Sequence, residues 1–272
     1  MSLVINTNVA SLNAQRSLAK SGAELSTAME RLSSGKKINS AADDAAGFAI
    51  AERMTAQVRG LNMAAKNASD GLSMLATIEN ATNDVTDMLH RMRELAVQAA
   101  NDTNGATDRG YLQTEVTALI AEIDRVSSDT KYNGTAVLDG TFTTKKLQVG
   151  TEASQTITFS VDGVSASALS VDAVSVSSQA GATAALTAIS TAIEAVASDR
   201  ATYGALQNRL EYTVSNLMNV SEFTQAARSR IEDADFAAES ARLSKAQVLQ
   251  QTGTAMLAQA NASQQLALSL FR

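Results

Sequence analysis

Apolar residues recur at alternating intervals of three and four residues, and this spacing constrains the fold more than any other feature. Side chains spaced in this way share one face of an α-helix and pack against the same face of another helix. The longest run begins at Met54, slips by three residues at Ile78 and continues to Ala99. Such a slip overwinds a coiled coil locally without ending the helix. We therefore predict one helix over residues 40–100, about 90 Å long at about 1.5 Å per residue.

The ends of this helix also have sequence signatures. Ser40 and Asp43 form a Ser-x-x-acid pattern, which caps the free N–H groups at a helix start. Residues 101–105, which finish on Gly105, are typical of the loop that follows a helix.

Two further runs predict two more helices. One extends over residues 112–126, with Thr107 or Asp108 as its N-cap. The other covers residues 203–231 and is expected to begin upstream, near Thr183. The short loop after the first helix predicts an antiparallel pair. Three such apolar faces favour a rod of antiparallel helices.

The segment between the second and third helices has a different period. Ile157, Phe159 and Val161 alternate with polar residues, which is the spacing of a half-buried strand. Pairs typical of tight turns punctuate the segment: Asn133-Gly134, Asp139-Gly140 and Asp162-Gly163. We predict a small β element over residues 131–180, with Asp162-Gly163 as a hairpin turn.

The two ends of the chain carry weaker heptads. Near the N-terminus the heptad is Leu18, Leu25 and Leu32, with Met29 between them. Near the C-terminus the heptad is Leu249, Met256, Ser263 and Leu270, offset by Thr252, Gln259 and Leu266. Each seam is too sparse to hold an isolated helix in water. We expect the two ends to be buried against each other and against other subunits; the alternative is two frayed helices that pack within their own chain.

Together these patterns predict a mainly α fold. A long antiparallel helical rod, or coiled coil, with a small β-hairpin element is expected over residues 44–232. A discontinuous terminal helical domain is expected to combine residues 1–43 with 233–272. The chain has no Pro, which would break helix interiors. Aromatic residues are only 4%, which suits thin helical packing.

Composition excludes several classes of function. With no Cys, the chain has no disulfide, Cys-based zinc site or Cys nucleophile. A net charge of −6 argues against nucleic acid as the main partner. No run of 18 apolar residues is present, so we expect no transmembrane helix. The first residues lack a basic leader with an apolar block, so if the protein leaves the cell, we expect it to use a route other than the general secretory one.

Several long motifs of the chain resemble those of bacterial flagellins. They are INTNVASLNAQRSL, MERLSSGKKINSAADDAAGFAIAERM, RELAVQAANDTN, EIDRVSSDTKYNG and the C-terminal SRIEDADFAAESARLSKAQVLQQTGTAMLAQANASQQLALSLFR. The resemblance covers nearly the whole chain outside residues 140–182. It implies a secreted, extracellular subunit that polymerises into the flagellar filament for motility. A hook–filament junction protein of the same axial family is the alternative.

The resemblance also implies partners. The first is the chain itself, as a helical homopolymer whose terminal helices pair as an inner coiled coil. The others are an export chaperone and the flagellar type III export apparatus, the junction and cap proteins, and the vertebrate Toll-like receptor for flagellin. Carried over by motif, the receptor contacts are Arg91 and Leu95 in RMREL and Glu115 in LQTEV. The alternative reading is that these residues serve filament packing.

Residue patterns give little support to catalysis, a cofactor or a metal. His90 is the only histidine, and a solvated helical position explains it. The chain contains no H-E-x-x-H, Walker A or G-x-G-x-x-G motif. Asp43 and Asp44 are adjacent at a predicted helix start, where their interaction with the helix dipole is the better explanation. We predict that the protein is not an enzyme.

Overall fold

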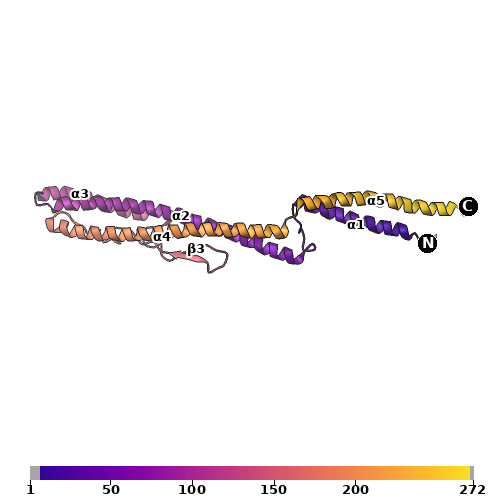
Figure 1. The fold of residues 1–272 in the computed structure, drawn as a ribbon. Coiled ribbons are helices and arrows are strands. Elements are labelled where there is room, and N and C mark those ends of the chain that lie inside the picture. Colours follow the sequence, from indigo (N-terminus) through magenta and orange to yellow (C-terminus); the bar gives the residue numbers. More distant parts are fainter. Residues whose placement is uncertain (1–6, 270–272) are drawn as a thin grey trace. The chain divides into compact units, whose positions relative to one another are not determined.

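A computed structural model describes residues 7–269 and is mainly helical (Figure 1). Its helices in chain order are α1 (Val9–Ser34), α2 (Ala45–Ala100), α3 (Ala106–Asp129), α4 (Gln179–Glu232) and α5 (Phe236–Ser269). Its strands, all between α3 and α4, are β1 (Lys131–Tyr132), β2 (Thr135–Ala136), β3 (Lys145–Gln148) and β4 (Thr156–Phe159). The predicted fold class, a mainly α chain with long helices and a small β element, is confirmed.

The chain divides into two compact units, which we describe separately. The rod unit comprises Gln57–Glu222. The terminal unit comprises the chain up to Ala56 together with the chain from Phe223. Helices α2 and α4 each contribute residues to both units.

The core of the rod unit confirms the predicted seam of α2. The predicted positions are buried from Val58 to Ala99, on both sides of the slip at Ile78, apart from the half-buried Leu72. From α3, Val116 and Ile123 join the same core, and α4 adds Ile189, Val196, Tyr203 and Leu210. Apolar faces on three helices therefore bury one another, as the alternating spacing predicted.

Two predicted helix starts were wrong. Helix α2 begins at Ala45, because the Asp44 carboxylate accepts hydrogen bonds from the N–H groups of Ala46 and Gly47, at 3.1 and 2.9 Å. The Asp43 carboxylate instead accepts from Ser40 N–H at 3.0 Å and closes the turn before the helix. A Ser-x-x-acid pattern can close a free-standing turn as well as cap a helix, since both use the same side chain–backbone bond.

The N-cap of α3 also differs from the prediction. Gly105 is the N-cap, and Thr107 and Asp108 lie within the first turn of the helix. The Asp108 carboxylate reaches back and accepts from Gly105 N–H at 3.0 Å. An acid three residues into a helix satisfies a free N–H group just as an N-cap side chain does.

The β element forms two antiparallel pairs, β1–β2 and β3–β4. Asn133-Gly134 is the predicted two-residue turn, with φ of 48° and 80°. The predicted hairpin turn at Asp162-Gly163 was wrong, because β4 pairs with the preceding β3 through a loop at residues 149–155. Gly163 instead allows close approach: a Cβ there would lie 3.0 Å from the Cα of Gly140. Next to this contact between the two glycines, Val164 N–H donates to Leu138 O at 3.0 Å.

In the terminal unit α1 and α5 pack along each other in antiparallel directions. Leu18, Leu25 and Leu32 of the predicted α1 heptad are half-buried, in line with buried small residues of the same helix. Met29, however, is 51% exposed. The α5 side of the seam has a different register from the prediction: Leu243, Ala246, Gln250, Gly253, Leu257 and Ala260.

Gly253 explains part of this difference in register. A Cβ at Gly253 would lie 3.2 Å from Leu18 Cδ1, so the glycine brings α5 close to a leucine of α1. Close to the N-terminal end of α1, Asn8 Nδ2 donates to Ala260 O at 2.9 Å. The hairpin therefore buries small residues, and it leaves the predicted Leu249 and Met256 exposed.

Helix α4 is, by length and composition, apolar enough to cross a membrane, which the sequence-based expectation did not anticipate. One 18-residue window has a mean hydropathy of 1.4. The apolar face of α4 includes Ala182, Ala185, Ile189 and Val196, and these side chains are buried in the core of the rod unit. One face of α4 therefore packs in the core of the rod unit.

Candidate interaction surfaces

Arg91 and Glu115, predicted to share a surface patch, meet across α2 and α3. Arg91 donates from Nε to Glu115 Oε1 at 2.8 Å, and its Nη2 lies 2.8 Å from the same oxygen. Both side chains remain about half exposed, at 50% and 45%. The sequence-based prediction missed Glu94, whose Oε2 accepts from Arg91 Nη1 at 2.9 Å. Its position three residues after Arg91 on a helix is the signal that could have revealed it.

The two carboxylates define the electrostatics of this patch. Hydrogen bonds to Glu115 and then to Glu94 hold the pKa of the Arg91 guanidinium above its ordinary value. One cation therefore lies between two anions on an exposed surface, with its guanidinium held in a fixed orientation. A partner that binds Arg91 must either share this arrangement or displace a carboxylate.

Leu95 does not lie on the exposed surface with Arg91. Its side chain is 1% exposed and belongs to the core of the rod unit, beside Met92 and Ala96. The nearest exposed apolar residue along α2 is Val97, at 57%. The structure therefore brings together Arg91 and Glu115 but places Leu95 in the core. A direct role for Leu95 in contacting a partner remains a prediction.

The predicted assembly residues divide by position. Leu18, Leu25 and Leu32 are half-buried within the chain, and Leu18 lies against Gly253 of α5. Leu249 and Met256 are 44% and 60% exposed on α5, and Val248 beside them is 60% exposed. The side chain of Leu266, and Leu270 as a whole, lie outside the described residues. Helix α5 thus exposes large apolar side chains in addition to the seam that it buries against α1.

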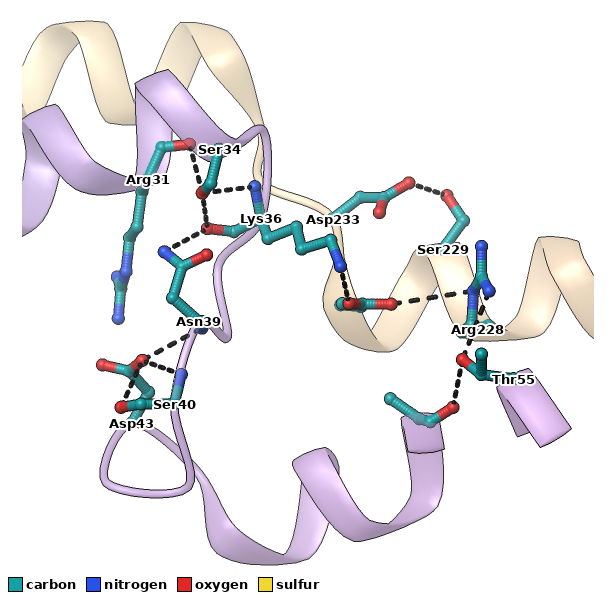
Figure 2. Close-up of polar contacts among 12 residues, drawn as sticks. Arg31, Ser34, Lys36, Asn39, Ser40, Asp43, Thr55, Arg228, Ser229 and Asp233 are labelled. Carbon is teal, nitrogen blue, oxygen red and sulfur yellow. Dashed lines mark hydrogen bonds and ion pairs between the residues drawn. The ribbon is translucent and has the colours of Figure 1, made fainter. Parts of the chain in front are cut away.

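The links that join the terminal helices to their neighbours are tied together (Figure 2). Lys37 N–H donates to Glu232 O at 2.7 Å, and Ala234 N–H donates to Gly35 O at 2.9 Å. The Lys36 ammonium pairs with the Glu232 carboxylate, which is only 15% exposed. These contacts join the segment after α1 to the segment after α4 as a short antiparallel bridge.

Further side chains fix each link. Arg228 lies 3.6 Å from the second carboxylate oxygen of Glu232, and its Nη1 donates to Thr55 Oγ1 at 3.2 Å (Figure 2). On the other link, backbone hydrogen bonds from Ser40 and then Asn39 hold the pKa of the Asp43 carboxyl below its ordinary value. The connecting segments therefore have defined backbone partners in the terminal unit.

Other chemistry-bearing residues have structural explanations. Asp43 and Asp44 cap a turn and a helix, as described above. His90 is exposed on α2. Within residues 7–269, no group of three or more His, Asp and Glu side chains is placed to hold a metal ion.

Sequence models of one family match both ends of the chain. The model described as "Bacterial flagellin N-terminal helical region" matches residues 5–143. The model described as "Bacterial flagellin C-terminal helical region" matches residues 186–271. Between them they leave out residues 144–185, a segment that includes β3 and β4, and a few residues at the two ends of the chain.

Relatives match over almost the whole chain. A flagellin of Halalkalibacterium halodurans is 43% identical over 272 residues, covering 99% of this chain and 100% of the relative. A flagellin of Bacillus subtilis is 40% identical, covering 98% and 99% respectively. The flagellar filament 33 kDa core protein of Treponema phagedenis is 40% identical, covering 99% and 100%.

Solved structures agree with these relatives. The crystal structure of a Bacillus cereus flagellin aligns with a TM-score of 0.51 at 34% identity, covering 56% of this chain and 88% of that one. The structure of a putative flagellar hook-associated protein from Vibrio parahaemolyticus aligns with a TM-score of 0.59, covering 70% of this chain and 100% of that one. Its identity is only 15%, so that second likeness shows a shared fold alone.

Proposed function

Because the chain belongs to the bacterial flagellin family, we propose that it is secreted and that its copies polymerise outside the cell into the flagellar filament. It is a structural subunit, and its homologues form the filament that serves motility. The match includes both terminal regions and extends over the full length of relatives named as flagellins or filament proteins. The junction-protein alternative is not favoured.

The observation that carries the proposal is the exposed apolar face of α5. Leu249 and Met256 lie on it, although α5 already buries a separate seam against α1. Exposed apolar residues grouped on one helix face favour contact with a partner. A second copy of the chain fits, because every copy presents the same face. We place this contact in the terminal domain of residues 1–43 with 233–272.

Export is the second part of the proposal. We propose that the unfolded chain passes through the flagellar type III apparatus with an export chaperone, and that cap and junction proteins receive it. Weak packing of the terminal hairpin supports this route. Its described seam is rich in Ala, Ser and Gly, so little apolar surface is buried to oppose unfolding.

Restoring swimming tests this function directly. The gene should be expressed in a bacterium whose own flagellin gene is deleted. We expect extracellular filaments and swimming from the full chain, and neither from a Met256→Gln chain secreted at the same level. Secretion of the full chain without any filament would contradict the proposal.

Receptor recognition is a second candidate function, carried by the Arg91–Glu115 pair. We propose that the vertebrate Toll-like receptor for flagellin binds released monomer at this patch. The side chains are half exposed and held in fixed orientation, so a receptor meets a preorganised polar surface. A dose–response in receptor-expressing cells tests the idea, and equal potency of monomer and intact filament would argue against a buried assembly surface.

A further inference from the structure

The sequence contains two Asn-Gly dipeptides, and their hydrogen bonding differs in the folded structure. Asn104-Gly105 lies between α2 and α3, and Asn133-Gly134 forms the turn between β1 and β2. An asparagine followed by glycine can lose ammonia spontaneously, since glycine has no Cβ to hinder approach to the asparagine side chain. Folded structure decides whether the reacting atoms are free.

The chemistry needs one backbone nitrogen and one side-chain carbon. The glycine nitrogen, after losing its proton, attacks Cγ of the preceding asparagine. The Cγ–Nδ2 bond breaks and ammonia leaves with a proton, which yields a five-membered succinimide. Water then opens the ring at Cγ to give aspartate, or at the backbone carbonyl to give isoaspartate. The net reaction consumes one water and releases one ammonia, with no oxidant or reductant.

At Asn104-Gly105 both reacting groups are occupied. Gly105 N–H donates to the Asp108 carboxylate at 3.0 Å, a charge-assisted bond. Asn104 Nδ2 donates to Gln98 O at 2.5 Å. Asn104 N–H also donates to Asn101 O at 3.2 Å, which holds the loop in place. Attack at Cγ must break the first bond and release the amide from the second.

At Asn133-Gly134 the asparagine side chain and the glycine N–H group are free to react. Both residues are exposed, and a Cβ built on Gly134 would meet nothing within 4 Å. Among the described residues, the Asn133 side chain and Gly134 N–H have no hydrogen-bond partner. Asn133 also adopts a φ of 48°, a left-handed conformation that few side chains tolerate.

We propose that Asn133 is a site of spontaneous deamidation in the folded protein and that Asp108 protects Asn104 from the same reaction. The two products differ in their effect on the turn. Aspartate keeps the backbone and tolerates a left-handed φ, so it preserves the β1–β2 register. Isoaspartate adds a carbon to the main chain of a two-residue turn, so it disrupts that register. Both products add one negative charge near Lys131.

The test compares the two dipeptides within one protein. Purified folded chain should be incubated at mildly alkaline pH and then digested. Both peptides should be followed by liquid chromatography coupled to mass spectrometry. The mass reports deamidation, and the retention time separates the aspartate product from the isoaspartate product. We expect conversion at Asn133 to be faster by about tenfold or more, which corresponds to about 1.4 kcal/mol. In denaturant the two rates should converge, because only folded structure separates the sites.

Two variants assign the cause. Asp108→Ala should speed conversion at Asn104 about tenfold and leave Asn133 unchanged. Asn133→Gly keeps a turn that accepts glycine at both positions, and it should abolish conversion in that peptide. Circular dichroism confirms that both variants fold. Equal rates at the two sites in folded wild-type protein would overturn the proposal. An unchanged Asn104 rate in folded Asp108→Ala protein would overturn the protective role of Asp108.

Discussion

Arg91 of α2 and Glu115 of α3 are joined at 2.8 Å although 24 residues separate them in sequence. The pair is on the surface, where ion pairs contribute little to stability. The main effect of the pair is therefore to hold the exposed Arg91 guanidinium in one orientation beside two carboxylates. A substitution of Arg91 can therefore change binding to a partner without changing the stability of the fold.

Arg91→Ala should weaken activation of the Toll-like receptor about tenfold or more, because an oriented Arg is a frequent hot-spot residue. Its melting temperature should stay close to that of the wild type. Arg93→Ala, an exposed neighbour without this pair, is the matched control and should retain potency. Unchanged potency of well-folded Arg91→Ala protein would show that the carried-over site is wrong.

Leu95→Ala should act through stability. Leu95 is 1% exposed, and removal of a buried leucine side chain costs about 2–5 kcal/mol. Val97→Ala, at 57% exposure on the same helix, should change stability by about 0.5 kcal/mol or less. Urea unfolding followed by circular dichroism measures both. Similar midpoints for the two variants would mean that Leu95 is not a core residue.

Glu232→Ala should loosen the links of the terminal unit. It removes the carboxylate that pairs with Lys36 and approaches Arg228, and so leaves two cations without that partner. We expect protease cleavage within residues 35–44 to become several-fold faster while the rod unit stays resistant. Glu211→Ala, an exposed acid on the same helix, should cleave like wild type. Equal cleavage of all three proteins would mean that this contact does not hold the links.

Asp199 gives a prediction for pH dependence. Burial, and then the nearby Asp162 carboxylate, raise the pKa of Asp199 above its ordinary value. The folded state then binds the proton more tightly than the unfolded state. Stability contributed by this group falls as pH rises from the ordinary aspartate value through the raised one, and the penalty persists at neutral pH.

Asp199→Asn should therefore raise the melting temperature at pH 7, and this advantage should shrink in acid, where wild-type Asp199 is protonated. Asp162→Asn removes only the secondary cause and should give a smaller gain. Melting curves across pH provide the measurement. A destabilised Asp199→Asn protein at pH 7 would mean that the charged carboxylate makes a favourable contact.

The positions of the rod core were predictable from the sequence because one apolar face dominates each helix. The seam of α2 passes its slip at Ile78 without a break, and each predicted residue from there to Ala99 is buried. The same pattern shows why Leu95 is buried. It lies three residues after the seam position Met92, so it widens the same face. Reading the seam as a broad stripe would have placed Leu95 in the core.

The register of α5 was not predictable in the same way. Leu249 and Met256 fit one heptad, while Leu243 and Leu257 fit another, and periodicity alone cannot tell which face meets α1. The choice depends on a long-range contact, the approach of Gly253 to Leu18. The starts of α2 and α3 were missed for a local reason, because an acid near a helix start can cap the helix or close a turn.

The most direct test of the filament account is electron microscopy of purified chains under polymerising conditions. The full chain should form long filaments. A chain lacking residues 250–272, and the full chain with Met256→Gln, should form none while their monomers keep the unfolding midpoint of the rod. Leu257→Ala, which alters the half-buried seam with α1, should instead lower the helix content of the terminal unit in the monomer. Long filaments from the truncated chain, or none from the full chain, would contradict the account.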